Sequence, residues 1–199
     1  VDDSTLAEAC GAKVVYRDDS VAVVKEGEPL LTDLRQVDDL KIPDPKKDGR
    51  LPLWLETTSR IAEKIGGGMP CMAECGGYMY LSDEMEDMEG RVWPMTGAVP
   101  GKVFRTEKLG RFGYIRLEAV QGGVLGSGCG PLRGHEFHYF DSTDCGSAFH
   151  AQKPNRKRGW DCIHGTETMM AGFPHLYYYA CPDLAVEFLK KCCEYGGTK

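Results

Sequence analysis

Cys75 is the residue of this sequence best placed to act as a nucleophile. It follows a short apolar run, residues 69–74, that predicts a buried strand, and Gly76 and Gly77 follow it at a predicted turn into a helix. A nucleophile on such a sharp turn needs small neighbours, and the Gly76 N–H can face a developing oxyanion. The start of the helix would lower the pKa of the thiol. A buried structural cysteine is equally compatible with the local pattern.

A thiol nucleophile also needs a base, and the chain has five histidines. Spacing alone cannot choose among them, because the base lies near the nucleophile in space rather than in sequence. The candidates are His135, His138, His150, His164 and His175.

The segment RGHEFHY contributes four candidate residues of open role: Arg133, His135, Glu136 and His138. Arg133 and Glu136 could simply pair, and the two histidines could be satisfied by the backbone. The His-x-x-His spacing has no third ligand nearby, and we attribute the spacing of Cys71 and Cys75 to chance. No metal site is predicted.

Composition and charge narrow the class of protein. The 199 residues suit one domain or two small ones, and 42% hydrophobic with 27% charged residues is ordinary globular composition. The net charge of −6 argues against nucleic acid as a main partner, because phosphate binding needs a basic face. The basic run at residues 152–160 is interpreted as a solvated loop. No apolar stretch predicts a membrane span, and no signal peptide is visible at the start of the sequence.

The cysteines point to a reducing compartment. There are nine, an odd number, and no Cys-x-x-Cys pair occurs among them. This pattern matches neither a disulfide framework nor a zinc site. Reduced thiols are typical of the cytoplasm, where we expect the protein to be located.

The candidate residues must be positioned by strands and helices, and the sequence contains patterns typical of each. Helices are predicted over residues 4–10, 51–65, 76–85 and 183–195, and strands over 12–16, 18–31, 69–74, 92–104, 110–120, 133–142 and 175–181. The segments at residues 40–50 and 122–131 are predicted loops. The expected fold is α/β, with a mixed or parallel sheet covered by helices. The expected core residues are Val14, Val15, Leu55, Ile61, Met72, Phe112, Tyr114, Phe137, Leu176, Phe188 and Leu189.

Four ordered segments resemble the cobyrinate a,c-diamide synthase family, whose amidotransferase domain is of the class I type. They are PCMAECGGYMYL, MTGAVPGKVFRTEKLGRFGYIRLEA, PLRGHEFHYFDS and MAGFPHLYYYACPDLAVEFL, within residues 68–193. The resemblance implies that Cys75 is the nucleophile that releases ammonia from glutamine and that His175 activates this cysteine. It also implies that Gly76 and Glu74 contribute to the oxyanion site or support Cys75 and His175. Relatives usually have a second histidine where this chain has Tyr177.

The resemblance also implies an ATP-dependent partner. The family's amidating half holds a phosphate-binding loop, and no Gly-x-x-x-x-Gly-Lys-Ser/Thr occurs here. We therefore expect no cofactor in this chain, with ATP and Mg²⁺ on a partner synthetase that amidates a corrinoid or other tetrapyrrole carboxylate. The family's glycine-rich segment before the nucleophile has only a faint counterpart in residues 65–70.

Residues 1–66 resemble a different family, the uroporphyrinogen decarboxylases and corrinoid methyltransferases. That family folds as a barrel of about 250 residues, which this segment cannot close. The expected division is residues 1–66 and 67–199, as a natural fusion or an engineered chimera, and an incomplete sheet edge favours a homodimer. Alternative functions are a non-catalytic binding or assembly protein, and a protein like the corrinoid or porphyrin methyltransferases.

Overall fold

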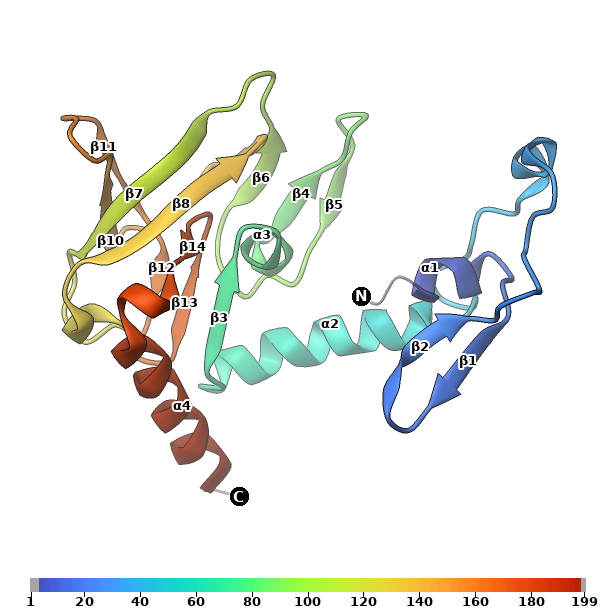
Figure 1. Ribbon diagram of the computed structural model, residues 1–199, viewed down its shortest axis with the longest axis horizontal. Helices are drawn as coiled ribbons and strands as arrows, with labels where there is room; N and C mark the ends of the chain where they lie inside the picture. Colours follow the sequence, from blue (N-terminus) through green and yellow to red (C-terminus); the bar gives the residue numbers. More distant parts are fainter. Residues whose placement is uncertain (1–3, 198–199) are drawn as a thin grey trace. The chain divides into compact units, whose positions relative to one another are not determined.

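The computed structural model describes residues 4–197 (Figure 1). The chain divides into two compact units, of which the first ends at Arg60 and the second begins at Ile61. Over residues 4–197, no helix has the length and hydrophobicity that crossing a membrane requires.

The first unit is built around one β-hairpin. Its elements are α1 (Ser4–Ala9), β1 (Val14–Arg17), β2 (Ser20–Val24), the 3-10 helix η1 (Leu34–Asp39) and the beginning of α2 (Leu51–Gly66). β1 and β2 pair antiparallel, and Arg50 holds α1 through an ion pair of 2.6 Å from its Nε to Glu8 Oε2. The described part of this unit has one two-stranded sheet and forms no barrel.

The second unit holds three sheets. The five-stranded sheet has the order β11 (Gly159–Cys162), β10 (Phe149–Gln152), β7 (Arg111–Ala119), β8 (Leu132–His138), β14 (His175–Leu176) and is antiparallel throughout. The four-stranded sheet has the order β5 (Val92–Pro94), β4 (Glu84–Glu86), β6 (Lys102–Arg105), β9 (Phe140–Ser142). The three-stranded sheet has the order β12 (His164–Gly165), β13 (Met169–Gly172), β3 (Cys71–Glu74).

The helical elements of this unit are short except for the last. They are α3 (Gly76–Leu81), the 3-10 helices η2 (Ser127–Cys129) and η3 (Tyr178–Ala180), and α4 (Pro182–Gly197). The protein therefore has the expected mixed α/β architecture, with mixed and antiparallel sheets flanked by helices.

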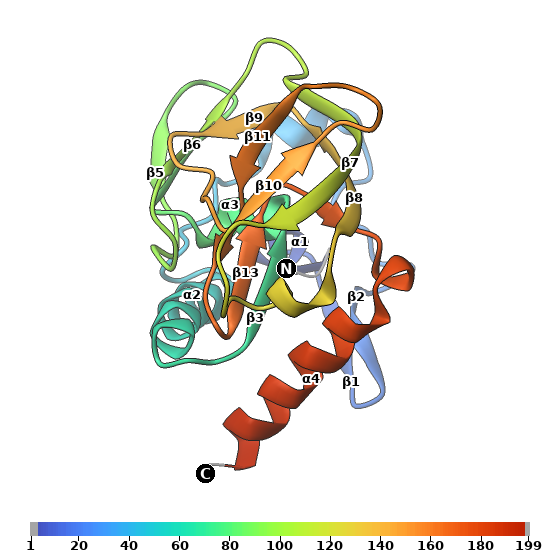
Figure 2. The same cartoon turned by 90° about the vertical axis from the view of Figure 1, so that its left-hand side faces the viewer.

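The parallel pairing of β3 with β13 positions the candidate site. Cys71 pairs with Met169 and Glu74 pairs with Gly172, so the two strands run in the same direction and their carboxyl ends lie side by side (Figure 2). All four residues of β13 are buried, which suits a central strand without polar alternation. The sequence analysis did not predict β13.

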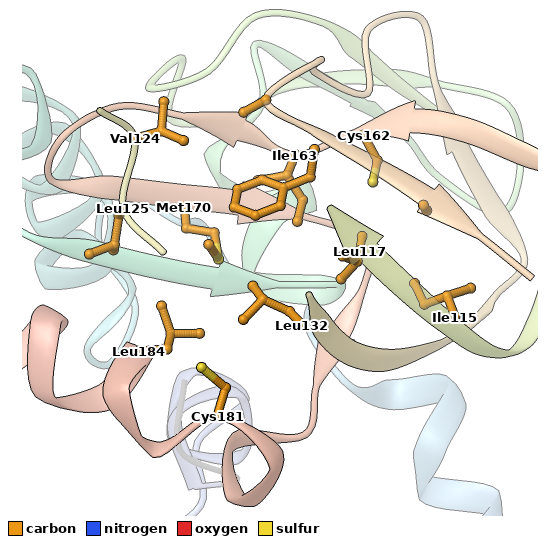
Figure 3. Close-up of a cluster of buried hydrophobic side chains, with 13 residues drawn as sticks. Ile115, Leu117, Val124, Leu125, Leu132, Cys162, Ile163, Met170, Cys181 and Leu184 are labelled. Carbon is orange, nitrogen blue, oxygen red and sulfur yellow. The ribbon is translucent and has the colours of Figure 1, made fainter. Parts of the chain in front are cut away.

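Two buried clusters hold the second unit together. The first joins the inner face of β7 and β8 to β10, β13 and the start of α4, where Leu184 and Cys181 face Leu132 (Figure 3). The second surrounds Tyr78 of α3, whose ring packs edge-on against Phe173 at 5.0 Å. Because α3 is anchored by Tyr78, the corner that precedes it is held in place.

Five expected core residues are exposed instead, and three of them lie on β7 and β8. Phe112, Tyr114 and Phe137 are 62%, 79% and 52% exposed. Along β8 the residues alternate strictly, and the buried set begins with Leu132 and includes Glu136 and His138. The prediction placed the aromatic residues of β7 and β8 in the core. The first buried cluster instead packs against the opposite face of these strands, the face that carries Leu132. The other two are Leu55 and Leu189.

Several predicted elements are shorter than expected or divided. The strand predicted over residues 18–31 is limited to Ser20–Val24, the one over 92–104 is β5 and β6, and the one over 133–142 is β8 and β9. The strand predicted over residues 175–181 is a strand at His175–Leu176 and then a 3-10 helix. The helix predicted after Cys75 ends at Leu81, and β4 begins at Glu84.

Candidate active site

Cys75 occupies the corner between β3 and α3. Its backbone has φ 48° and ψ −107°. A positive φ is rare for a residue other than glycine and costs on the order of 1–3 kcal/mol. The corner is fixed from both sides, because the Cys75 N–H donates to the Gly172 carbonyl at 2.9 Å and the Cys75 carbonyl accepts from the Met79 N–H at 2.9 Å. The corner therefore has the strained geometry of a nucleophile elbow.

The thiol at this corner has a raised pKa. Burial is the main cause, the Glu136 and Glu74 carboxylates add to it, and the Gly76 N–H acts in the opposite direction. The start of the helix was expected to lower the pKa of this thiol. That expectation was wrong, because α3 has only six residues and desolvation outweighs the Gly76 hydrogen bond. Cys75 is therefore a neutral thiol near pH 7 and needs a base.

The glycines after Cys75 are not required by packing. A Cβ at Gly76 would meet no heavy atom within 4 Å, and one at Gly77 would meet Ala73 Cβ at an ordinary 3.6 Å. The packing would therefore accept an alanine at either position, so glycine itself is not required by the neighbouring atoms. What Gly76 provides is open space beside the Cys75 corner.

Glu74 links the Cys75 corner to His175. His175 lies three residues beyond β13, and its Nδ1 is 3.6 Å from Glu74 Oε2, within ion-pair range but longer than a hydrogen bond. Glu74 Oε1 accepts hydrogen bonds from the Leu176 N–H at 3.2 Å and the Tyr178 hydroxyl at 2.6 Å. The carboxylate next to the thiol therefore holds the segment that carries the imidazole.

The remaining contacts of His175 come from β8. β14 pairs antiparallel with β8 so that His175 faces His135, and the two rings stack with centroids 5.0 Å apart. Tyr177, at the position where the family resemblance implied a second histidine, is 59% exposed, and its N–H donates to the Arg133 carbonyl at 2.8 Å. Glu74, rather than Tyr177, contacts the imidazole.

The residues of RGHEFHY divide between the two faces of β8. Arg133 and His135 are exposed, whereas Glu136 and His138 are buried. The ion pair between Arg133 and Glu136 that the sequence left open is therefore not formed. The two histidines cannot share a metal ion, and residues 4–197 contain no group of three or more His, Cys, Asp or Glu side chains arranged to hold one.

The buried pair is part of a polar network beneath the site. Glu136 is fully buried and accepts from Trp160 Nε1 at 3.3 Å, and its other oxygen is 3.5 Å from His138 Nε2. His138 Nδ1 lies 2.5 Å from the Phe140 carbonyl, and its ring stacks on Phe173 at 4.1 Å. These contacts satisfy a carboxylate that would otherwise be costly to bury.

Three contributors to the site were not identified from the sequence. Tyr178 holds Glu74, the Gly172 carbonyl holds the Cys75 backbone, and Trp160 caps Glu136. Tyr178 lies in a run of three tyrosines, and nothing in their spacing distinguishes it. Gly172 ends the strand that sequence patterning missed.

Comparison with known proteins gives two family matches. Residues 53–180 match the CobB/CobQ-like glutamine amidotransferase domain, and residues 1–90 match uroporphyrinogen decarboxylase. Both resemblances inferred from the sequence motifs are thus confirmed, and the second extends beyond residue 66. The two matched ranges overlap over the segment that contains Cys75.

Curated relatives are named cobyrinate a,c-diamide synthase. The protein of Caldanaerobacter subterraneus subsp. tengcongensis is 34% identical over 138 residues, which is 68% of this chain and 30% of the relative. That of Fusobacterium nucleatum subsp. nucleatum is 35% identical over 128 residues, 62% of this chain and 28% of the relative. One from Dehalococcoides mccartyi is 38% identical over 129 residues, 62% of this chain and 28% of the relative. The chain thus spans less than a third of the length of these relatives.

Proposed function

The chain belongs to the family of CobB/CobQ-like glutamine amidotransferase domains, and from that premise we propose that it releases ammonia from glutamine with Cys75 as the nucleophile. The observation that supports this most directly is the arrangement around Glu74. It is the residue before the cysteine, and its carboxylate lies 3.6 Å from the His175 imidazole.

The proposed reaction has two steps. Cys75 Sγ attacks the side-chain amide carbon of glutamine and its proton passes to His175 Nε2. The C–N bond then breaks, and the imidazolium gives that proton to the leaving nitrogen, which departs as ammonia. A water molecule, deprotonated by the same imidazole, attacks the glutamyl thioester and releases glutamate and the free thiol.

The electrostatics of the site suit this sequence of events. Because the pKa of Cys75 is raised, the resting nucleophile is a neutral thiol rather than a preformed thiolate. Glu74 faces Nδ1 of His175, which leaves Nε2 to take the proton from sulfur. The imidazolium formed during attack is then stabilised by the adjacent carboxylate.

Gly76 is proposed as an oxyanion donor. Its N–H is directed at the Cys75 sulfur in the free protein. The space beside its Cα is open, so a substrate carbonyl can approach both the N–H and the sulfur.

The acceptor of the ammonia is proposed to lie on a partner. Relatives named cobyrinate a,c-diamide synthase are more than three times as long as the matched region. We propose an ATP-dependent synthetase that amidates a corrinoid or related tetrapyrrole carboxylate. In the described part of the chain, no group of three or more His, Cys, Asp or Glu side chains is arranged to hold a metal ion, so we place ATP and Mg²⁺ on that partner. Nine free cysteines support a cytoplasmic setting.

Glutamate release from glutamine tests the proposal. The wild-type chain should form glutamate, and Cys75→Ser should abolish it. Cys71→Ser is the matched control, because Cys71 lies on β3, the strand that leads to Cys75, and is also half-buried. Each protein is assayed alone and in the presence of an ATP-dependent synthetase. Equal rates for wild type and Cys75→Ser in both settings would reject a glutaminase.

A non-catalytic binding or assembly role is the second candidate, and the raised pKa of Cys75 favours it. A glutamine-analogue electrophile such as 6-diazo-5-oxo-norleucine separates the two. Stoichiometric labelling of Cys75, blocked by glutamine, is expected of the enzyme. Absence of labelling is expected of the assembly protein.

A further inference from the structure

A large groove lies on the exposed face of β7 and β8 in the second unit. Its volume is about 1320 Å³, and the segment joining β10 to β11, residues 153–158, forms its other wall. Sites for small ligands usually measure about 300–1,000 Å³. The groove is therefore larger than glutamine needs.

The groove is lined by positive charge. Its lining includes Arg116, Arg133, Lys153, Arg156 and Lys157 and no Asp or Glu, on a chain of net charge −6. Gathering five cations on one face of an acidic protein creates a local positive potential that an anionic occupant would neutralise.

Most of this charge is available to an occupant. Among the described residues, Arg133, Arg156 and Lys157 have no carboxylate within ion-pair distance, and all three are exposed. Arg116 contacts Glu118 at 3.0 Å in a pair that is more than half exposed on both sides. Such exposed pairs are weak and yield readily to a stronger partner.

The loop wall is held in position. Lys153 Nζ donates to the Phe112 carbonyl and lies 5.7 Å from the Trp160 ring, and Arg158 lies 5.8 Å from the same ring. Trp160 is in turn fixed by its hydrogen bond to the buried Glu136. The basic run, interpreted from the sequence as a solvated loop, is thus one wall of a preformed groove.

The groove reaches the candidate active site. His135 lines it and stacks on His175, and Tyr177, which also lines it, follows His175 by two residues. An occupant would therefore lie beside the base that is proposed to assist ammonia release. Exposed tyrosines such as Tyr114 and Tyr177 are side chains that protein interfaces favour.

We propose that this cationic groove is the docking site for an acidic segment of the partner synthetase that uses the ammonia. The proposal rests on the proposed function, because the position of the groove matters only if ammonia is made at His175 and Cys75. Size favours a protein segment over a small anion, and the charge and tyrosines of the lining fit Asp- or Glu-rich chain.

The test uses a fluorescein-labelled oligoglutamate peptide and the full chain, with binding followed by fluorescence anisotropy over a salt series. Wild type should bind, with an affinity that falls as salt rises. Arg156→Glu with Lys157→Glu should weaken binding by about tenfold, since each reversal removes an attraction and adds a repulsion. The matched control, Lys108→Glu with Lys190→Glu, changes the net charge equally outside the groove and should stay within about twofold of wild type.

Several results would overturn the docking site. Equal losses in the two double variants would show attraction to overall charge alone, and no binding by wild type at low salt would exclude an acidic segment. Stronger binding of a single-stranded oligonucleotide than of oligoglutamate would replace it with a phosphate ligand. Labelling of Cys75 by the glutamine analogue is measured on the same variants. If the groove variants lose peptide binding but Cys75 is still labelled, the groove binds the peptide and the active site is intact. If Cys75 of the wild-type protein is not labelled, the proposed function is refuted.

Discussion

Glu74→Gln separates the charge of this side chain from its hydrogen bonds. The amide oxygen of glutamine can still accept from the Leu176 N–H and the Tyr178 hydroxyl, which now lie 3.2 and 2.6 Å from Oε1. The fold of the segment should therefore persist. What disappears is the negative charge 3.6 Å from His175 Nδ1 and next in sequence to Cys75.

Loss of that charge should slow glutamine turnover. At 3.6 Å a carboxylate and an imidazolium attract by about 1.2 kcal/mol in water and about 4.6 kcal/mol at an effective dielectric constant of 20. The side chains of His175 and Glu74 are 37% and 25% exposed, so an intermediate value applies. About 1.4–2.7 kcal/mol of transition-state stabilisation corresponds to a loss of about tenfold to a hundredfold in kcat.

The same substitution should speed simple alkylation of Cys75. The pKa of this thiol is raised first by burial and further by the Glu136 and Glu74 carboxylates. Removing one carboxylate lowers that pKa, so more thiolate is present near pH 7 and iodoacetamide reacts faster. Turnover and alkylation thus change in opposite directions, which a merely structural role for Glu74 would not produce.

Steady-state glutamate release and peptide mass spectrometry of iodoacetamide-treated protein measure the two rates. Tyr178→Phe is the control that keeps the charge and removes one hydrogen bond. It should leave alkylation of Cys75 unchanged and lower turnover by about tenfold, the low end of the value of one hydrogen bond to a charged group. Unchanged turnover in Glu74→Gln, or a fall in both rates, would refute the role assigned to this carboxylate.

Three further predictions follow from the packing. Gly76→Ala should change stability by less than about 1 kcal/mol, since its Cβ meets nothing within 4 Å, but should raise the KM for glutamine. Gly126→Ala should lower the unfolding free energy by about 1–3 kcal/mol, because φ is +81° and its Cβ would lie 2.9 Å from Met170 Cε. Burial raises the pKa of Cys162 above its ordinary 9.0. The thiol of the unfolded chain ionises first, so the contribution of Cys162 to the free energy of unfolding should be complete below about pH 9 and decrease above it. Urea titrations over this pH range should show a smaller decrease in the free energy of unfolding for Cys162→Ala.

β8 shows how far patterning alone reaches. Alternation correctly predicted a strand in RGHEFHYFDS, because side chains of successive residues point to opposite faces. It could not show which face is covered, and hydrophobicity indicated the wrong one. Phe137 is exposed while Glu136 and His138 are buried, because Trp160 of β11 and Phe173, which follows β13, contact the two buried side chains. Long-range partners decide burial where both faces carry chemically mixed residues.

The site divides in the same way between local and long-range information. The corner at Cys75 was predictable from the residues beside it, since a strand, a cysteine and two glycines follow in order. The contact between Glu74 and His175 depends on the pairing of β3 with β13, and four apolar residues in β13 give no sign of a partner. The raised pKa of the thiol comes first from burial and is increased further by Glu136, which the pairing of β8 brings near the site.

The β3–β13 pairing also bears on how the protein forms during synthesis. Glu74 and Leu176 are 102 positions apart, so a ribosome adding about 5–20 residues per second exposes β3 for roughly 5–20 s before its neighbour emerges. Through that interval the nascent chain presents an apolar strand edge with nothing to pair it, a state prone to aggregation. Yield of the native protein in a cell should accordingly depend on chaperone supply and on the speed of translation between β3 and β13.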